Sequence, residues 1–288
     1  MSMNSFHARN SKPRATQSKR SVTAHAGTRA DQLLVERGLA GSRTAAQRLI
    51  AAGRVSWQSP QGTQRVGKPA DYLPDSAELQ VAEDAEDRFV SRGGHKLAGA
   101  LAQSGVAVAG RCCLDLGQST GGFSDCLLQA GAANVIGVEV GHGQLHARLA
   151  DDARVVTLEG LNARSLSASD LGEHFPQGGF DLVTGDLSFI SLTLVLPAAA
   201  ALMHPQADLL MLVKPQFEVG PKGLAKGGIV RDTALYPEVE ARIRAACADC
   251  GLTVQGWYDS PITGGDGNRE FFVHARRAAD APESAGQS

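Results

Sequence analysis

From Arg111 onward, short apolar segments alternate with longer amphipathic ones. This alternation is typical of strand–helix–strand units, in which helices cover both faces of a parallel sheet. The apolar segments predict seven strands, at Cys112–Leu116, Val135–Glu139, Val155–Leu158, Phe180–Gly185, Asp208–Val213, Val254–Tyr258 and Phe271–Ala275. The amphipathic segments predict helices at Gly94–Ser104, Phe123–Ala130, Ser191–Met203 and Tyr236–Cys250. We therefore expect an α/β, Rossmann-like unit with a doubly wound sheet.

The N-terminal region has a different pattern. Arg29–Gly38 combines helix-forming residues with a terminal glycine, the usual residue at the C-terminus of a helix. A second helix is expected to start at Ser42, a good N-cap residue, and to end near Gly53. Short strand-like segments follow at Arg54–Trp57, Gln64–Val66 and Glu78–Val81. The pattern predicts a small α+β module over residues 29–87 and the α/β unit over residues 88–277, with disordered tails at residues 1–28 and 278–288.

The net charge of −2 hides a strong asymmetry along the chain. Residues 1–58 hold ten lysines and arginines against two acids, a local charge of +8, so the other 230 residues hold 18 basic and 28 acidic groups, a charge of −10. Such asymmetry is typical of a basic module that binds a polyanion, joined to a body with another role. Arg43 and Arg54 share one face of the second helix, which suits contact with phosphate groups.

Composition excludes several classes of protein. Hydrophobic residues make up 43% of the chain and charged residues 20%, which excludes a wholly disordered or fibrous protein. No apolar run reaches the roughly 18 residues that a membrane span needs, and the first 28 residues lack the apolar core of a secretory signal. The five cysteines are odd in number and do not form a disulfide pattern. We therefore expect a cytoplasmic protein with free thiols.

A glycine-rich loop, Asp115-Leu-Gly-Gln-Ser-Thr-Gly-Gly-Phe123, follows the first predicted strand. Ligands of α/β sheets bind beyond the carboxyl ends of the strands, where glycines let the backbone approach them. The loop lacks the dinucleotide and P-loop spacings. Its Asp-x-Gly-x-x-x-Gly arrangement occurs in many methyltransferases, where the loop holds the methionine part of S-adenosylmethionine.

Polar residues at the next two strand ends extend this cofactor prediction. Glu139 ends the second strand and suits hydrogen bonds from two ribose hydroxyls. Asn162 follows the third strand and suits contact with adenine. Three such features in order at strand ends favour a cofactor site over unrelated turn and cap residues. The predicted cofactor contacts are Asp115, Gly117, Gln118, Ser119, Thr120, Gly121, Gly122, Phe123, Glu139, Asn162 and Asp186.

Two lysines and two acids are expected at the same sheet edge. Asp186 and Lys214 directly follow the fourth and fifth strands. Lys96 lies at the start of the helix before the first strand, and Glu270 precedes the last strand. Transfer of a methyl group from a sulfonium to a ribose hydroxyl needs a base for the hydroxyl proton. At an effective dielectric constant near 20, one charge about 4 Å away contributes roughly 4 kcal/mol, which is enough to decide whether Lys214 can accept that proton.

Residues 29–82 resemble an S4 RNA-binding domain. The shared motifs are Arg37-Gly-Leu39, Ser42-Arg43 and Ala52-Gly-Arg-Val55, whereas Ala30 and the long loop Ser56–Gln64 depart from the family pattern. The resemblance implies a surface that holds structured RNA through its shape and backbone charge. The expected RNA contacts are Arg29, Arg37, Arg43, Arg48 and Arg54, with Arg92 and Lys226 in the α/β unit.

Longer motifs occur in order through the rest of the chain: Ser91-Arg-Gly-Gly-His-Lys-Leu97, Asp186-Leu-Ser-Phe-Ile-Ser-Leu192, Leu212-Val-Lys-Pro-Gln-Phe-Glu218, Lys226-Gly-Gly-Ile-Val-Arg-Asp232, Ser260-Pro-Ile-Thr-Gly264 and Gly267-Asn-Arg-Glu-Phe271. With the glycine-rich loop, they resemble the TlyA, or hemolysin A, family over about residues 29–277. His95 and Gln118 depart from that family, which usually has an apolar and a small residue at these positions.

The resemblance implies an S4 domain followed by an FtsJ-like ribose methyltransferase domain. The implied activity is S-adenosylmethionine-dependent 2′-O-methylation of cytidine in the ribosomal RNA of one or both subunits. The S4 domain would then dock structured ribosomal RNA or a ribosomal subunit. The family's catalytic set falls on Lys96, Asp186, Lys214 and Glu270.

Other interpretations stay open at this point. A nicotinamide-dependent oxidoreductase also uses an α/β sheet, although the expected glycine motif is missing. A non-catalytic RNA-binding protein would share the basic module, and the family name also raises a membrane-damaging activity. Cys247 and Cys250 lack a second pair of ligands for zinc, and His142 and His146 lack the glutamate of a zinc-protease helix. No metal site is therefore expected.

Overall fold

The computed structural model describes residues 27–82 and 88–277, and the chain divides into two compact units between Glu83 and Asp84. Residues 1–26 of the predicted N-terminal tail and the whole predicted C-terminal tail lie outside the described residues, as do residues 83–87, which directly precede the predicted boundary between residues 87 and 88. Thr28, which the sequence assigned to the tail, pairs with Leu73 in a two-stranded sheet. Its hydroxyl donates a hydrogen bond of 2.6 Å to Asp75, so the N-terminal unit begins slightly earlier than predicted.

The N-terminal unit packs two helices against small antiparallel sheets. Its elements are β1 (Thr28–Arg29), α1 (Ala30–Glu36), α2 (Arg43–Ala51), β2 (Val55–Ser59), β3 (Gly62–Arg65), β4 (Tyr72–Leu73) and β5 (Leu79–Val81). Strand β1 pairs with β4, and β2 lies between β3 and β5. Ser42 caps α2 as predicted, because its hydroxyl accepts a hydrogen bond of 3.2 Å from the Ala45 amide. Leu34, Ile50 and Val55 are buried between the layers, which confirms the small α+β module.

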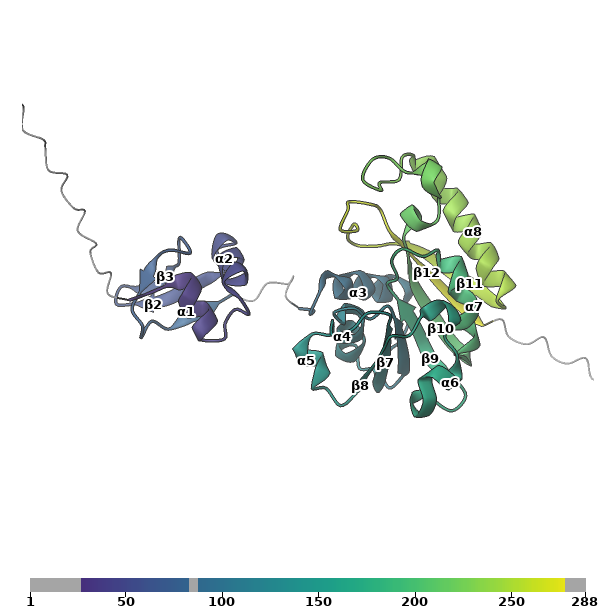
Figure 1. Ribbon diagram of the computed structural model, residues 1–288, viewed down its shortest axis with the longest axis horizontal. Helices are drawn as coiled ribbons and strands as arrows, with labels where there is room; N and C mark the ends of the chain where they lie inside the picture. Colours follow the sequence, from purple (N-terminus) through teal and green to yellow (C-terminus); the bar gives the residue numbers. More distant parts are fainter. Residues whose placement is uncertain (1–26, 83–87, 278–288) are drawn as a thin grey trace, which may run out of the picture. The chain divides into compact units, whose positions relative to one another are not determined.

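The C-terminal unit is built on a seven-stranded sheet of order β11-β12-β10-β9-β6-β7-β8 (Figure 1). Its strands are β6 (Cys112–Leu116), β7 (Asn134–Glu139), β8 (Val155–Glu159), β9 (Phe180–Gly185), β10 (Met203–Val213), β11 (Leu252–Asp259) and β12 (Phe271–Arg277). Its α-helices are α3 (Arg92–Ser104), α4 (Gly122–Gln129), α5 (Ala147–Ala150), α6 (Ala168–Leu171), α7 (Leu196–Ala201) and α8 (Tyr236–Asp249). Each of the seven predicted strands is confirmed.

Short 3₁₀ helices occupy several of the connections. They are η2 (Ala163–Ser165), η3 (Gly172–His174), η4 (Leu192–Leu194), η5 (Pro215–Phe217), η6 (Pro221–Gly223) and η7 (Thr233–Leu235). Three of them, η2, η4 and η5, come shortly after strands β8, β9 and β10. They therefore shape the loops at the carboxyl edge of the sheet.

The last strand departs from the predicted parallel sheet. Strands β6 to β10 pair with one another in parallel, whereas β12 is antiparallel to both β10 and β11. A parallel pair needs a crossover of a dozen or more residues, usually a helix, and only the loop of residues 260–270 joins β11 to β12. The start of β12 therefore lies at the edge where the parallel strands end.

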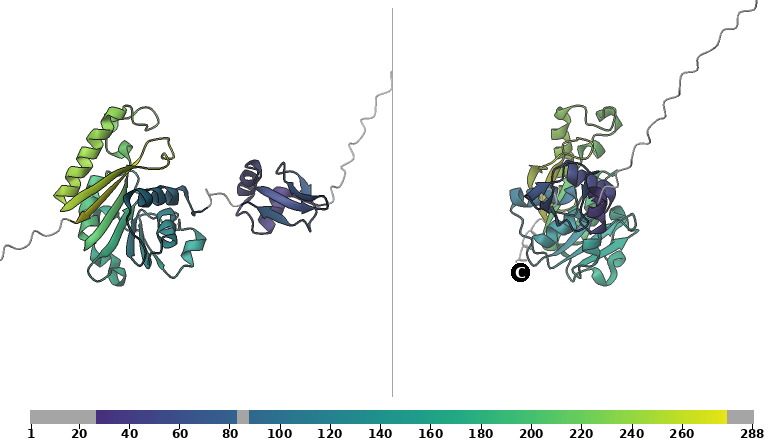
Figure 2. Two further views of the ribbon diagram at one scale, coloured as in Figure 1. Left: turned by 180° about the vertical axis from the view of Figure 1, so that it is seen from behind. Right: turned by 90° about the vertical axis from the view of Figure 1, so that its left-hand side faces the viewer.

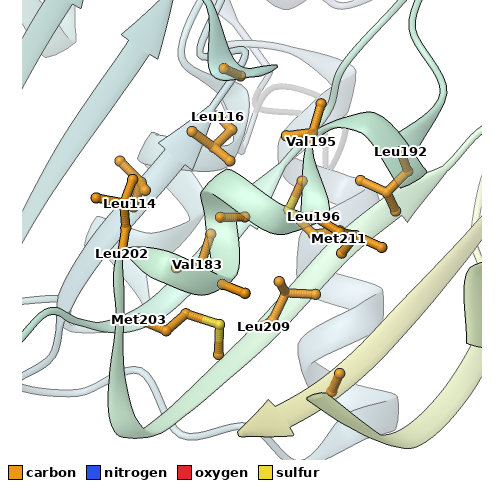
Figure 3. Close-up of a cluster of buried hydrophobic side chains, with 14 of the residues drawn as sticks. Leu114, Leu116, Val183, Leu192, Val195, Leu196, Leu202, Met203, Leu209 and Met211 are labelled. Atoms are coloured by element: carbon orange, nitrogen blue, oxygen red, sulfur yellow. The ribbon is translucent and has the colours of Figure 1, made fainter. Parts of the chain in front are cut away.

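Side chains of β10 point alternately to the two faces of the sheet. Leu209 and Met211 pack in the cluster that includes Leu196 of α7, as Figure 3 shows, and helix α8 contributes to the same cluster. Leu210 and Leu212 pack instead in the cluster that includes residues of α3 and α4. Helices α7 and α8 thus cover one face of the sheet and α3 and α4 the other, and Figure 2 shows this arrangement from two further directions. Because both faces are packed, the carboxyl ends of the parallel strands are held in fixed positions.

Two elements of the C-terminal unit differ most from the prediction. The helix predicted at Ser191–Met203 is divided into η4 and α7, since Pro197 fits only the first turn of a helix. Strand β10 begins at Met203 rather than Asp208, with a register irregularity against β9 between these residues. Among residues 27–82 and 88–277, we find no helix that is both long and apolar enough to cross a bilayer.

Candidate active site

The sheet topology brings the four predicted catalytic residues to one edge. Val213, the last residue of β10, pairs with Phe271, the first residue of the antiparallel strand β12. Lys214 and Glu270 are therefore neighbours, although one follows its strand and the other precedes its strand. Asp186 directly follows β9, the parallel neighbour of β10. Lys96 reaches the same edge from the first half of α3.

The four side chains form a continuous charged cluster, which we call the tetrad (Lys96, Asp186, Lys214 and Glu270). Lys96 Nζ lies 2.6 Å from Glu270 Oε2 and 3.8 Å from Asp186 Oδ2. Lys214 Nζ lies 2.6 Å from Asp186 Oδ1 and donates a hydrogen bond of 2.8 Å to Ser188 Oγ. Two amines and two carboxyl groups thus lie at short range.

Burial makes the tetrad electrostatically strong. The side chains of Lys96 and Glu270 are 9% and 2% exposed, whereas that of Asp186 is 23% exposed. Charges interact more strongly when water is excluded, and an isolated buried charge is costly. The Lys96–Glu270 pair therefore forms the buried part of the tetrad, and Asp186 and Lys214 form its more accessible part.

Glycines allow the close approaches around the tetrad. A Cβ atom at Gly264 would lie 2.6 Å from Oε1 of Glu270, and one at Gly94 would lie 2.3 Å from the ring of Phe89. The second contact lets α3 lie close to Phe89, which brings Lys96 to the sheet edge. Arg92, at the start of α3, donates a hydrogen bond of 3.1 Å to the carbonyl of Thr263.

The glycine-rich loop has the backbone conformation that its sequence predicts. Gly117 and Gly121 have φ angles of +77° and +92°, in the region that favours glycine. Gly122 starts α4 directly beside Ser91, because a Cβ at Gly122 would lie 2.1 Å from the Ser91 hydroxyl oxygen. The loop therefore folds tightly between strand β6 and helix α4.

Glu139 holds this loop to the end of β7. Its Oε2 accepts a hydrogen bond of 2.9 Å from the Ser119 amide, and its Oε1 accepts one of 2.8 Å from the Gly141 amide. The residue is 9% exposed. Each carboxylate oxygen can accept a further hydrogen bond, so the geometry permits the predicted contact with ribose hydroxyls.

The Gln118 side chain turns into the protein. Its Nε2 donates to Ser124 Oγ at 2.9 Å, and its Oε1 accepts from Thr157 Oγ1 at 2.8 Å. A Cβ at Gly137 would lie 2.0 Å from the Gln118 amide carbon, so this glycine makes room for it. Gln118 can therefore meet a cofactor only through its backbone in this arrangement.

Asp115 lies below the loop and is completely buried. Its Oδ2 accepts a hydrogen bond of 2.7 Å from Ser124 Oγ. Burial raises the pKa of Asp115 to about 7, although the Ser124 hydrogen bond opposes the rise and the charge of Asp186 adds to it. Asp115 thus supports the loop from beneath.

Three cavities adjoin the tetrad. The large cavity, of about 510 Å³, contains the predicted residues Gly117, Ser119, Glu139, Asn162 and Asp186. The loop cavity, of about 200 Å³, contains Gln118, Thr120, Gly122 and Phe123. The lysine cavity, of about 390 Å³, is lined by Lys96, Lys214 and Glu270. Asp186 lines the first two and Lys214 the last two, so the tetrad lies where the three meet.

Sequence reasoning missed several lining residues. The large cavity also has apolar walls of Val138, Leu161 and Ile190, together with Gln144 and Phe189. Phe189 is 92% exposed, has a φ angle of +64°, and lies 5.4 Å from Phe217 between ring centroids. It lines both the large and the lysine cavity. Its place in the motif that begins at Asp186 was an available signal.

Four of the five predicted RNA-binding arginines of the N-terminal unit bind other groups of the protein. Arg29 and Arg43 bind Asp31, which is fully buried, with Nη2–Oδ2 distances of 3.0 Å each. The Arg29 hydrogen bond, which outweighs the effect of burial, holds the pKa of Asp31 far below its ordinary value. Arg37 donates to the carbonyls of Asp75 and Ala77, and Arg54 donates to that of Ala82. Arg43 keeps 57% of its side chain exposed despite this contact.

Two residues of the cysteine and histidine pairs have structural positions in the fold. Within the described parts of the chain, no group of three or more histidine, cysteine or acidic residues is placed to hold a metal ion. Cys247 is buried in the core against the sheet, and burial raises the pKa of its thiol to about 12. His146 instead caps α5, accepting a hydrogen bond from the Arg148 amide.

Comparison with known proteins agrees with this geometry. The profile of the FtsJ-like methyltransferases matches residues 89–277. The 16S/23S rRNA (cytidine-2′-O)-methyltransferase TlyA of Mycobacterium tuberculosis is 46% identical over 89% of this chain and 92% of its own length. The 23S rRNA (cytidine-2′-O)-methyltransferase TlyA of Campylobacter jejuni is 31% identical over 74% of this chain and 79% of its own length.

A solved structure extends the similarity to both units. A Streptococcus thermophilus protein named after hemolysins is 38% identical, with a TM-score of 0.64, and the match covers 91% of this chain and 94% of that one. The family match excludes the nicotinamide-dependent oxidoreductase that the α/β pattern had left open. The chain belongs to the TlyA family of FtsJ-like methyltransferases.

Proposed function

We propose that this protein transfers the methyl group of S-adenosylmethionine to the 2′-hydroxyl of a cytidine in ribosomal RNA. The observation that carries the proposal is the position of the tetrad at the junction of the large, loop and lysine cavities. The two TlyA relatives are named for the same transfer to cytidine in ribosomal RNA. A ribosomal RNA substrate also implies that the enzyme works in the cytoplasm.

The large cavity and the loop cavity suit S-adenosylmethionine. The glycine-rich loop offers backbone amides beside the loop cavity, where an amino acid group fits. Glu139 and Asn162 face the large cavity, where they suit a ribose and an adenine, respectively. The apolar walls of Leu161 and Val138 suit the faces of a purine ring. When bound, S-adenosylmethionine supplies a methyl group on a positively charged sulfur.

The tetrad supplies the groups that a ribose hydroxyl needs. A lysine that already carries its proton cannot accept another, so Lys214 would act in its neutral form as the base for the ribose hydroxyl, while bound S-adenosylmethionine would supply the methyl group. Uptake of the hydroxyl proton would leave Lys214 positively charged, and Asp186, 2.6 Å away, is placed to stabilise that charge. Lys96 lies between Glu270 and Asp186, where it offsets the negative charge of the two carboxylates and fixes their positions. Alignment of the hydroxyl within this cluster contributes the rest of the rate enhancement.

The lysine cavity suits the target nucleoside. It lies on the tetrad and is lined by Ser188, Gln216 and the two aromatic residues Phe189 and Phe217. The exposed Phe189 ring offers a face on which a nucleobase can stack. A base inside a duplex cannot reach such a cavity, so the target nucleotide must leave its stack.

The N-terminal unit suits the docking of structured RNA. Arg43 is exposed while its orientation is fixed by the buried Asp31. Arginines ordered in this way meet phosphate groups with less loss of side-chain entropy. The exposed Arg48 and, in the C-terminal unit, Arg92 and Lys226 add to the predicted RNA-binding set.

The test is methyl transfer by the purified full chain to ribosomal subunits or naked ribosomal RNA, with labelled S-adenosylmethionine. Lys214→Ala should keep the cofactor affinity, measured by calorimetry, while the single-turnover rate falls by about 10²- to 10⁴-fold, because general-base help is lost. Arg244→Ala, on the outer face of α8 beside Glu240, is the matched control. Normal transfer by Lys214→Ala would refute the catalytic assignment, and no transfer by the wild type would refute the function.

A further inference from the structure

The loop Leu224–Val230 has a closed, hairpin-like backbone. Leu224 and Val230 form an antiparallel bridge, and the Ala225 amide donates a hydrogen bond of 2.7 Å to the Ile229 carbonyl. Gly227 and Gly228 make the turn with φ angles of +89° and +79°. Lys226 is exposed in this loop, directly before the turn. We call this segment the Lys226 loop.

The side chain of Asn268 holds the Lys226 loop at two points. Its Oδ1 accepts a hydrogen bond of 3.0 Å from the Val230 amide, and its Nδ2 donates one of 3.0 Å to the Gly228 carbonyl. Asn268 is 2% exposed, and its own carbonyl accepts a hydrogen bond of 2.8 Å from the Gly264 amide. One buried carboxamide thus joins the Lys226 loop to the loop that precedes β12.

Both joined loops border the site of the proposed reaction. Gly227 and Gly228 of the Lys226 loop line the lysine cavity, as do Gly265 and Asp266 of the other loop. Glu270 follows Asn268 by two residues but has separate support, because Lys96 pairs with its carboxylate and the Ser260 amide donates to its carbonyl. Loss of the Asn268 contacts would therefore free the Lys226 loop while leaving the tetrad in place.

We propose that Asn268 is a positioning residue that fixes the Lys226 loop at the mouth of the lysine cavity, where Lys226 meets the phosphate backbone next to the target nucleotide. This inference rests on the proposed function. A carboxamide is required because it combines a donor and an acceptor at one position. An aspartate has nearly the same shape, but it would direct an oxygen instead of a donor at the Gly228 carbonyl.

The test is a double-mutant cycle of Asn268→Ala and Lys226→Ala, with KM and kcat measured for methyl transfer to RNA. Each single variant should raise the KM for RNA about tenfold, and the double variant should raise it no further, because a loose loop no longer places Lys226. The kcat should change by less than about threefold, since the tetrad is intact. Cofactor affinity, measured by calorimetry, should stay at the wild-type value and shows that each variant is folded.

Asn268→Asp separates positioning from simple packing. It should raise the KM as much as Asn268→Ala, whereas a residue that only fills space would be rescued by this isosteric change. Asn134→Ala, an exposed asparagine at the opposite edge of the sheet, is the matched control. Additive effects in the cycle, or a normal KM in Asn268→Asp, would overturn the inference while the proposed function stands. A wild-type protein without RNA methylation would overturn both.

Discussion

Lys96 and Glu270 form a buried ion pair, with 2.6 Å between Nζ and Oε2, from opposite ends of the C-terminal unit's sequence. Helix α3 supplies the lysine, and the antiparallel course of β12 brings the glutamate to the same sheet edge. Neither charge has bulk water as a partner, since the two side chains are only 9% and 2% exposed. Each residue therefore depends on the other for both its position and its charge.

Removal of one partner should be costly. Glu270→Gln leaves Lys96 with only the more distant Asp186, and the loss of one member of a buried pair typically costs about 3–5 kcal/mol of unfolding free energy. We expect a loss at the lower end of that range, because Asp186 lies 3.8 Å away. Urea unfolding measures it. The double variant Lys96→Met/Glu270→Gln should be more stable than Glu270→Gln, and an equally unstable or less stable double variant would contradict the pairing.

The exposed ring of Phe189 should matter for RNA and not for folding. Phe189→Ala should lower kcat/KM for RNA by about tenfold or more, since stacking of a base on an aromatic ring contributes roughly 1–3 kcal/mol. The melting temperature should change little, because the residue is 92% exposed. Phe189→Tyr keeps the ring and should retain activity. A normal kcat/KM in the alanine variant would show that no base stacks there.

Asp115 should give the protein a pH-dependent stability near neutrality. Burial raises the pKa of its carboxyl to about 7 from an ordinary value of 3.8. The folded state therefore keeps the Asp115 proton over a pH range in which the unfolded chain, above about pH 4, has released it. The contribution of Asp115 to the unfolding free energy is complete below about pH 4 and is lost as the pH rises through about 7. This pKa shift corresponds to a loss of roughly 4 kcal/mol of unfolding free energy between low pH and high pH.

Asp115→Asn should remove this dependence while it keeps an oxygen to accept from Ser124. Urea unfolding at intervals from pH 4 to pH 8 should show a wild-type stability that falls relative to the variant as the pH rises. Parallel stability profiles for the two proteins would mean that Asp115 is ionised in the folded state at neutral pH.

RNA docking by the N-terminal unit should depend on the exposed arginines of α2. Arg48→Glu, on the exposed side of α2, should weaken binding to structured RNA. It should also reduce the slope of log Kd against the logarithm of the salt concentration by the equivalent of about one to two phosphate contacts. Arg43→Glu should also destabilise the unit, because it places a carboxylate beside the buried Asp31. Filter binding at several salt concentrations and thermal unfolding separate the two effects. An unchanged salt slope in Arg48→Glu would place the RNA elsewhere.

The strands of the sheet could be predicted well from sequence because their apolar runs are short and bounded. The predictions for β6 and β9 agree with the structure at both ends. The direction of β12 could not be predicted from its composition, since periodicity gives a strand but not its neighbours. That direction is what places Glu270, which precedes its strand, beside Lys214, which follows its own.

Side-chain direction limited the prediction of the site. Gln118 lies in the glycine-rich loop, yet its amide turns inward, because Gly137 leaves space and both Ser124 and Thr157 offer partners. Spacing predicted that Arg43 and Arg54 share a face of one helix, but α2 ends at Ala51, so Arg54 lies beyond it. The contacts of Arg29 and Arg43 with Asp31 depend on the packing of α1 against α2, which spacing along one helix does not reveal.

The most direct test of the account is the position of the new methyl group. Ribosomal RNA treated with the protein and S-adenosylmethionine should be digested to nucleosides and analysed by mass spectrometry. We expect 2′-O-methylcytidine, which should be absent when Lys214→Ala replaces the wild type. A methyl group on a base, or the same product in equal amount from Lys214→Ala, would contradict a tetrad that removes a proton from a ribose hydroxyl.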